Sequence, residues 1–284
     1  VDGAAGIAGK LGIPQLIVGL TIVAMGTSLP EAAVSITSAL KGSAGITIGN
    51  VVGSNIMNVL VILGITAVIT NVAIQKSTLY CEIPFMIGIT ALMIVFGITR
   101  RAVSFPEGVI FWILFIAFLA YLFVMSKKNK AAEEEAECQM SYLKCIIAGG
   151  IMVVWGSDLV VDAASEIARA FGMSERFIGL TIVAFGTSLP ELVTSVTAAK
   201  SGNAGIAIGN IVGSNIFNIL FVIGTTALIC NVPFESKFLI DSAVAVAAGV
   251  ILWLGTIRHK ELRRPCGVVM LVAYVGYFAY LCMN

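Results

Sequence analysis

The chain has 284 residues, of which 58% are hydrophobic and only 12% are charged, and its mean hydropathy is +1.01. Soluble domains carry about 25% charged residues, so this composition predicts an integral membrane protein. The net charge of +1 argues against a nucleic-acid partner.

Apolar stretches that are long enough to cross a bilayer follow one another along the chain. Residues 1–12 resemble the end of a further span whose beginning is absent. The charged segment Lys127–Gln139 cannot lie in hydrocarbon and is predicted to link two halves. The nine full spans that we expect are 14–40, 44–70, 79–99, 105–126, 142–168, 174–199, 204–230, 238–257 and 266–283.

The two halves of the chain repeat each other. Shifted by 160 residues, residues 1–70 overlay residues 161–230 without a gap, and 39 of the 70 positions carry the same residue. Unrelated apolar segments would agree at about 10% of positions, so shared composition does not explain the match and duplication does. The segment Met140–Val160 forms most of a span whose counterpart before Val1 is absent, and restoring it gives five spans per repeat.

An odd number of spans forces the two repeats into opposite orientations. The predicted fold is an all-α polytopic membrane protein with two inverted repeats of five transmembrane helices, the first helix being mostly missing. We expect the first repeat at residues 1–126, a charged linker at 127–140 and the second repeat at 141–284. Inverted repeats place substrate sites at their interface, near the bilayer midplane.

Loop charges predict the orientation. The loops on the side of the linker, together with Lys144 at the start of the next span, hold eleven Lys and Arg residues, and the other side holds six. The positive-inside rule therefore places the linker in the cytoplasm.

Each repeat carries a helix-breaking segment in the middle of a span, at Gly19–Glu31 and Gly179–Glu191. Its proline removes a backbone donor and frees a carbonyl about one turn earlier. Such a break is tolerated in a membrane only where it faces protein or a watery cavity. Each segment thus combines freed carbonyls, Thr and Ser hydroxyls and one carboxylate, which are the oxygen ligands that a hard cation prefers.

Glu31 and Glu191 carry the functional prediction. A charge near the bilayer centre costs about 2.5–3.5 kcal/mol on insertion scales, and the segments Gly19–Glu31 and Gly179–Glu191 contain no Lys, Arg or His. Two such carboxylates need cations or protons. Ca2+ takes 6–8 oxygen ligands whereas Mg2+ dehydrates reluctantly, and the absence of Cys and His disfavours transition metals. The alternative is a duplicated structural kink with a protonated glutamate.

A second repeated segment lies at Gly49–Asn58 and Gly209–Asn218. Ser54 and Asn58 are four residues apart, as are Ser214 and Asn218, so each pair shares a helical face. These faces would offer neutral oxygens to the same site. The alternative is a small-residue face for helix packing.

These motifs carry a family resemblance. GTSLPE at 26–31 and 186–191, with GNVVGSNIMN at 49–58 and GNIVGSNIFN at 209–218, resembles the two α-repeats of the calcium/cation antiporters, and within them the sodium/calcium exchangers. The resemblance covers almost the whole chain. The long central regulatory domain of animal exchangers is absent, so the chain is similar to compact prokaryotic members, and we expect a monomer in the inner (plasma) membrane.

The resemblance implies a set of site residues. The Ca2+ site would be made by Glu31 and Glu191 with the backbone carbonyls of Thr27 and Thr187. Asn218 stands where potassium-dependent members carry Asp, which argues against K+ coupling. The flanking Na+ sites would use Ala24, Ser28, Ser54, Ala184, Ser188 and Ser214, and Asn58 and Asn218 would line the centre.

The expected function is Na+/Ca2+ antiport by a transporter that is not an enzyme and has no cofactor. The closest alternative is Ca2+/H+ antiport through the same glutamates. A passive cation channel lacks support because there is no repeated pore-loop filter, and an intramembrane enzyme lacks a Ser/His or Cys/His pair.

Overall fold

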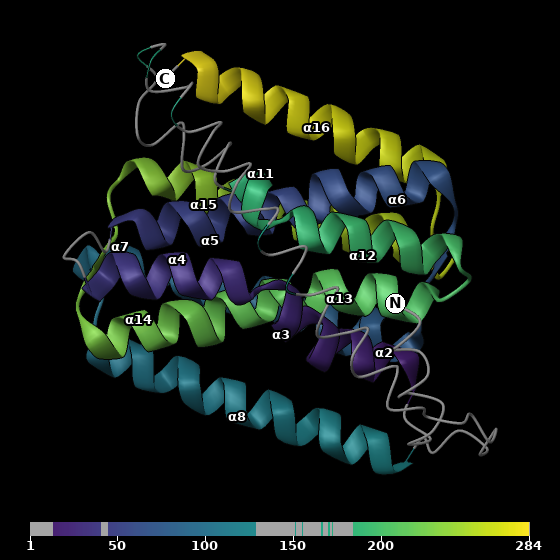
Figure 1. Cartoon of the computed structure of the whole chain (residues 1–284), viewed down its shortest axis with the longest axis horizontal. Coiled ribbons are helices and arrows are strands. Elements are labelled where there is room, and N and C mark those ends of the chain that lie inside the picture. Colours follow the sequence, from purple (N-terminus) through teal and green to yellow (C-terminus); the bar gives the residue numbers. More distant parts are fainter. Residues whose placement is uncertain are drawn as a thin grey trace.

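The computed structural model describes residues 14–40, 45–128 and 184–283, together with a few isolated positions between residues 151 and 172. Within these residues the chain is a bundle of helices (Figure 1). Six of them are long and apolar enough to cross a bilayer, and a bent pair at residues 15–40 forms a seventh candidate. They match the predicted spans closely. The remnant at 1–12, most of the linker, the span 142–168 and the start of the span 174–199 lie outside the described residues.

The first repeat begins with a helix that is broken at Ser28. One arm contains α2 (Gln15–Val18), the π-helical segment η1 (Gly19–Val23) and α3 (Ala24–Thr27), and the other is α4 (Leu29–Leu40). The arms meet at a bend of 45°. Pro30 lies in the first turn of α4, where its missing N–H would have no partner in the helix. The predicted break is therefore confirmed, and it falls just before the proline.

The rest of the first repeat contains three long helical stretches joined by short strands. In chain order they are α5 (Gly45–Met57), η2 (Asn58–Leu63), α6 (Gly64–Ile69), β1 (Val72–Ala73), η3 (Thr78–Glu82), α7 (Ile83–Arg100), β2 (Ala102–Val103) and α8 (Phe105–Lys128).

From the break onwards the second repeat follows the order of the first, except that no π-helical segment like η3 precedes α15 (Lys237–Ile257) in the part of the chain that the structure describes. Its elements are α11 (Ala184–Thr187), α12 (Leu189–Lys200), α13 (Ala204–Phe217), η5 (Asn218–Ile223), α14 (Gly224–Ile229), β3 (Val232–Pro233), α15, β4 (Glu261–Leu262) and α16 (Arg264–Met283).

Two short antiparallel ladders show that the repeats are inverted. β1 pairs with β4, so the start of the α7 span lies beside the end of α15. β2 pairs with β3, so the end of α7 lies beside the start of α15. These two helices are equivalent in the repeats and pack along each other. They therefore run antiparallel, as inverted repeats require.

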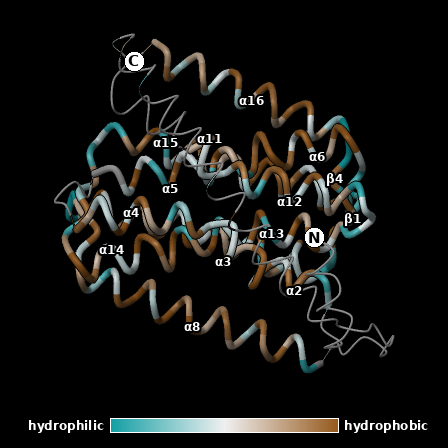
Figure 2. The backbone as a smooth tube through the Cα atoms, in the orientation of Figure 1, coloured by the Kyte–Doolittle hydropathy of each residue, from teal (hydrophilic) through white to brown (hydrophobic). Residues whose placement is uncertain are grey.

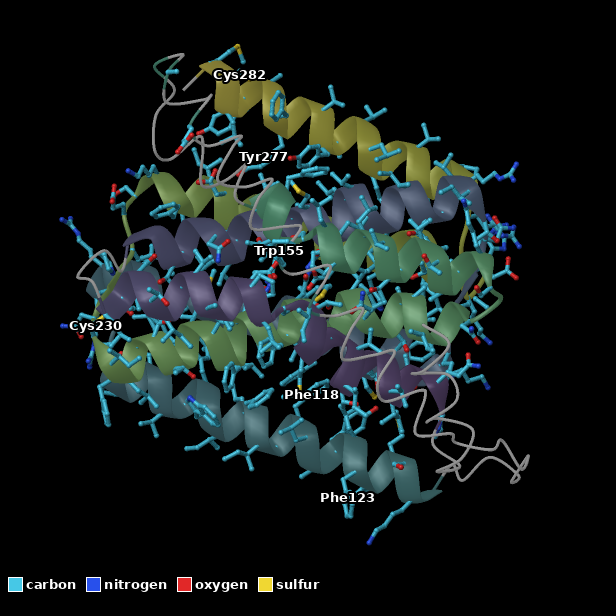
Figure 3. The ribbon with its side chains drawn as sticks, viewed as in Figure 1. Phe118, Phe123, Trp155, Cys230, Tyr277 and Cys282 are labelled. Carbon is cyan, nitrogen blue, oxygen red and sulfur yellow. The ribbon has the colours of Figure 1, made fainter. Side chains whose placement is uncertain are left out.

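The repeated helices form the centre of the bundle. In the most apolar 18 residues of the stretches 47–69 and 204–229, 78% and 94% of the residues are buried. In those of α8 and α16, only 28% and 22% are buried. Figure 2 shows α8 and α16 as hydrophobic along most of their length, with hydrophilic residues towards the ends of the bundle. α8 turns Phe118 inwards, where its ring stacks on Phe85 at 5.5 Å, and Phe123 outwards (Figure 3). Such outer faces suit contact with lipid.

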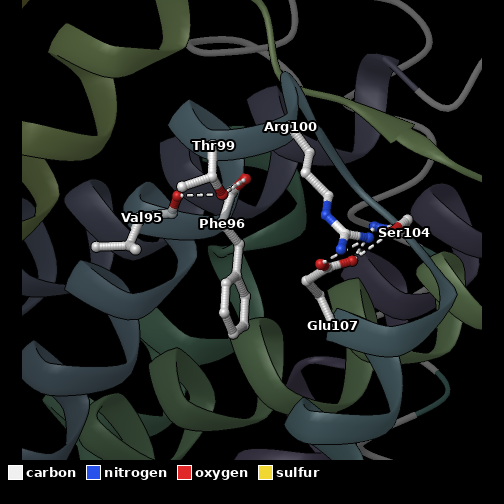
Figure 4. Close-up of polar contacts among 6 residues, drawn as sticks. All are labelled: Val95, Phe96, Thr99, Arg100, Ser104 and Glu107. Carbon is white, nitrogen blue, oxygen red and sulfur yellow. Dashed lines mark hydrogen bonds and ion pairs between the residues drawn. The ribbon is translucent and has the colours of Figure 1, made fainter.

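One half of a capping box, in which Glu107 reaches back to Ser104, is present at the start of α8. The carboxylate of Glu107 accepts hydrogen bonds from the backbone N–H of Ser104, at 3.0 Å, and from its hydroxyl, and Arg100 lies 3.5 Å from the other carboxylate oxygen (Figure 4). Ser104 precedes the helix and Glu107 is its third residue, which is the spacing of this motif. The contact joins the end of α7 to the start of α8.

Candidate ion-binding site

Glu31 and Glu191 are both fully buried. Each is the third residue of the helix that follows a break, α4 and α12 respectively. Their carboxylates therefore lie in a first helical turn, where the free N–H groups favour negative charge. The two glutamates lie near each other, because Ser28, three residues before Glu31, contacts the carboxylate of Glu191. None of the ion pairs among the described residues involves either of them.

Serine hydroxyls reach the carboxylates from the opposite repeat. Ser28 Oγ donates to Glu191 Oε1 at 2.8 Å, and Ser188 Oγ donates to Glu31 Oε1 at 3.4 Å. The break in each repeat thus places its serine against the glutamate of the other repeat. Ser214 Oγ, from α13, is a further donor to Glu191 Oε1 at 3.3 Å.

The remaining predicted residues of the first break lie around the same point. Ala24 O accepts hydrogen bonds from Thr27 Oγ1 at 3.3 Å and from Ser214 Oγ at 3.4 Å. Thr27 Oγ1 also donates to Asn210 Oδ1 at 3.0 Å. Residues from α3 and α13 therefore meet through polar groups within the apolar bundle.

The second break has a related but different set of contacts. Thr187 Oγ1 lies 3.3 Å from Ala184 O, to which it donates, and 3.4 Å from Ser54 Oγ. The hydroxyl of Ser54 thus contacts the second break as Ser214 contacts the first. All six residues that were predicted to flank the glutamates are consequently brought close to the two breaks.

Two asparagines that the sequence prediction missed brace the main chain of the glutamates. Asn50 Nδ2 donates to Glu31 O at 3.2 Å and to Ser35 Oγ at 3.0 Å. Asn210 makes the equivalent bonds in the second repeat, at 3.4 and 3.0 Å. Each of these polar residues recurs 160 positions later in the chain, which is the signal that could have identified them.

Asn58 and Asn218 open the π-helical segments η2 and η5 and are fully buried. Asn58 Nδ2 donates to Asn215 Oδ1 at 2.9 Å, and Asn218 Nδ2 donates to Asn55 Oδ1 at 3.1 Å. Their amide nitrogens are therefore used within the protein, and their carbonyl oxygens are not. π-helical turns occur frequently at functional sites.

Five buried oxygens of this centre have no hydrogen-bond donor among the described residues: Glu31 Oε2, Glu191 Oε2, Asn50 Oδ1, Asn58 Oδ1 and Asn218 Oδ1. Buried polar groups are nearly always satisfied, and these atoms accept but do not donate when the glutamates are charged. Carboxylate and amide oxygens are the ligands that hard cations prefer. No group of three or more His, Cys, Asp or Glu residues that could hold a metal occurs in the described part of the chain.

Two other fully buried acids lie outside the repeated motifs, and the sequence prediction passed over them. Tyr121 OH donates to Glu82 Oε1 at 2.5 Å, which joins α8 to the start of the α7 span. Tyr277 OH donates to Asp241 Oδ1 at 3.0 Å, which joins α16 to α15. Figure 3 places Tyr277 between those two helices. Each pair links the last two helices of a repeat.

Comparisons with known proteins find similar proteins over almost the whole chain. The family model described as "Sodium/calcium exchanger protein" matches residues 1–124 and 141–283. The putative antiporter CaxA of Alkalimonas amylolytica is 37% identical, over 98% of this chain and 91% of that protein. The sodium/calcium exchanger MaX1 of Methanosarcina acetivorans is 31% identical, over 99% and 93%. The structure of the sodium–calcium exchanger NCX_Mj soaked with Na+ and Ca2+ is similar at a TM-score of 0.84 and 34% identity, covering 98% of this chain and 90% of that one.

Proposed function

The chain belongs to the sodium/calcium exchanger family, and on that premise we propose that it exchanges Ca2+ for Na+ through a site formed by Glu31 and Glu191. It is a multi-pass membrane protein with the fold of that family. The proposal therefore concerns the identity of the site and the coupling of the two ions.

One observation carries the proposal: two fully buried carboxylates share a site that no basic side chain of the described residues enters. Their combined charge of about −2 equals that of one Ca2+, which tolerates bidentate carboxylates. Four carboxylate oxygens and the carbonyl oxygens of Asn58 and Asn218 would supply six ligands, within the usual range of 6–8. The main-chain carbonyls of Thr27 and Thr187 are the proposed additional ligands.

The flanking hydroxyls and carbonyls suit Na+. The proposed Na+ ligands are Ala24, Ser28, Ser54, Ala184, Ser188 and Ser214. Ser28 and Ser214 already contact Glu191, so a Na+ held there would use the same carboxylate as Ca2+. Two cations that share a buried carboxylate repel each other strongly in a medium of low dielectric constant. Binding of one ion would then displace the other, which is the basis of exchange.

We further propose that the face with the β1–β4 ladder is cytoplasmic. The described loops and helix ends there carry Lys76, Lys127, Lys128, Lys200, Arg258, Lys260, Arg263 and Arg264, whereas those at the β2–β3 face carry Arg100, Arg101 and Lys237. This asymmetry follows the positive-inside rule. A prokaryotic plasma membrane is the proposed location.

Uptake of 45Ca2+ into proteoliposomes loaded with Na+ tests the function. The proposal predicts uptake that requires an outward Na+ gradient and stops when a Na+ ionophore removes that gradient. Equal uptake in Na+-free medium, driven by a pH gradient, would favour Ca2+/H+ antiport instead.

A further inference from the structure

Four asparagines cross-link the two repeats at the centre of the bundle. They are Asn55 and Asn58 on the first repeat and Asn215 and Asn218 on the second, and all are at most 4% exposed. Asn215 Nδ2 donates to the main-chain oxygen of Asn55 at 3.1 Å, and Asn55 Nδ2 donates to the main-chain oxygen of Asn215 at 3.3 Å. The two bonds are equivalent under the exchange of repeats.

These bonds determine which way each amide points. A main-chain oxygen can only accept a hydrogen bond, so Asn215 must present its nitrogen to Asn55. The other end of the Asn215 amide is then an oxygen, which also only accepts. Asn58 must therefore present its own nitrogen to that oxygen, as the 2.9 Å bond shows. The same reasoning applies to the other pair: Asn55 presents its amide oxygen, and Asn218 donates its amide nitrogen to that oxygen at 3.1 Å.

The outcome is that both remaining carbonyl oxygens, Asn58 Oδ1 and Asn218 Oδ1, are buried and receive no hydrogen bond from the described residues. We infer that Asn55 and Asn215 are positioning residues, which orient the amides of Asn218 and Asn58 so that each offers an oxygen to the transported cation. The inference rests on the proposed function. It assigns a role in ion binding to two residues that would not touch the ion themselves.

Each positioning asparagine holds a ligand on the opposite repeat, and this makes the arrangement testable. Asn215→Ala removes the acceptor that holds Asn58 but leaves the main-chain oxygen that holds Asn55. Asn55→Ala removes the acceptor that holds Asn218 in the same way. Each alanine variant should therefore act through one ligand, on the opposite repeat.

The experiment is a pair of double-mutant cycles on the KM for Ca2+, measured as Na+-driven 45Ca2+ uptake. Asn215→Ala is expected to raise that KM about tenfold, the scale of one lost hydrogen bond in a buried site. It should have little further effect in an Asn58→Ala background and its full effect in an Asn218→Ala background. Asn55→Ala should show the reverse pattern.

Thr226→Val is the matched control, because Thr226 lies on the same helical stretch and bonds only within it, to Val222 O at 2.8 Å. It should leave the KM unchanged. An unchanged KM in Asn215→Ala and Asn55→Ala, or equal effects in both backgrounds, would overturn the inference. Failure of both alanine variants to fold would also overturn it, by assigning them a structural role. A parent protein that does not transport Ca2+ would contradict the proposed function as well.

Discussion

Ser28, at the break of the first repeat, donates a 2.8 Å hydrogen bond to the carboxylate of Glu191 in the second repeat. The reciprocal bond from Ser188 to Glu31 is longer, at 3.4 Å. Each carboxylate is therefore held by a hydroxyl of the repeat to which it does not belong. The site is complete only where the two breaks meet, so a relative movement of the repeats would change the surroundings of both glutamates together.

The hydroxyl of Ser214 should be more important for Na+ than for Ca2+. It lies 3.3 Å from Glu191 Oε1 and 3.4 Å from Ala24 O, among the oxygens that are proposed to bind Na+. Ser214→Ala, and likewise Ser54→Ala, should raise the Na+ concentration for half-maximal exchange about fivefold, the scale of one lost polar contact. The KM for Ca2+ should change less. Uptake assays over a range of Na+ and Ca2+ concentrations measure both, and a larger effect on Ca2+ would contradict the assignment.

Exchange should not require K+. The family resemblance implies that Asn218 stands where potassium-dependent members carry Asp, and the amide nitrogen of Asn218 is bonded to Asn55. Without that third carboxylate, the site has no additional charge for a further cation. Replacing K+ by choline on both sides of the membrane should leave Ca2+ flux unchanged, and loss of flux would show that K+ takes part.

Close packing of α13 against the first helix should depend on Gly209. A Cβ at this position would lie 2.7 Å from Leu16 O, whereas a Cβ at Gly88 would meet nothing within 4 Å. Because main-chain atoms cannot move aside as a side chain can, Gly209→Ala should lower the free energy of unfolding by about 1–3 kcal/mol. Gly88→Ala is the control and should be neutral or slightly stabilising. Thermal melting of the purified variants in detergent compares the two, and equal melting temperatures would contradict the packing argument.

The repeat made much of the fold predictable. Identity at a fixed offset of 160 residues established the duplication, and the odd number of spans implied the inversion that the β1–β4 and β2–β3 ladders confirm. Glu31 and Glu191 could be selected because a buried acid without a basic partner is costly in a membrane.

The hydrogen-bond partners within the centre were not predictable in the same way. Asn55 and Asn215 are repeated, but repetition does not say which end of an amide faces a neighbour. That depends on the main-chain oxygens that they meet across the repeat interface. Glu82 and Asp241 were missed for another reason, since they lie outside the repeated segments and each has its tyrosine partner on the next long helix, more than 30 residues away in the sequence.

The most direct test of the account is Na+-driven 45Ca2+ uptake by Glu31→Gln and Glu191→Gln, with Glu82→Gln as the control. Gln keeps the shape of the side chain and one carbonyl oxygen, but it removes the charge and the bidentate carboxylate that Ca2+ would use. Glu82 is equally buried but lies outside the site, bonded to Tyr121. The account predicts that both site variants remain folded, as judged by size-exclusion chromatography, and lose uptake, while Glu82→Gln retains it. If both site variants transport Ca2+ at rates close to that of the parent, Glu31 and Glu191 do not form the Ca2+ site.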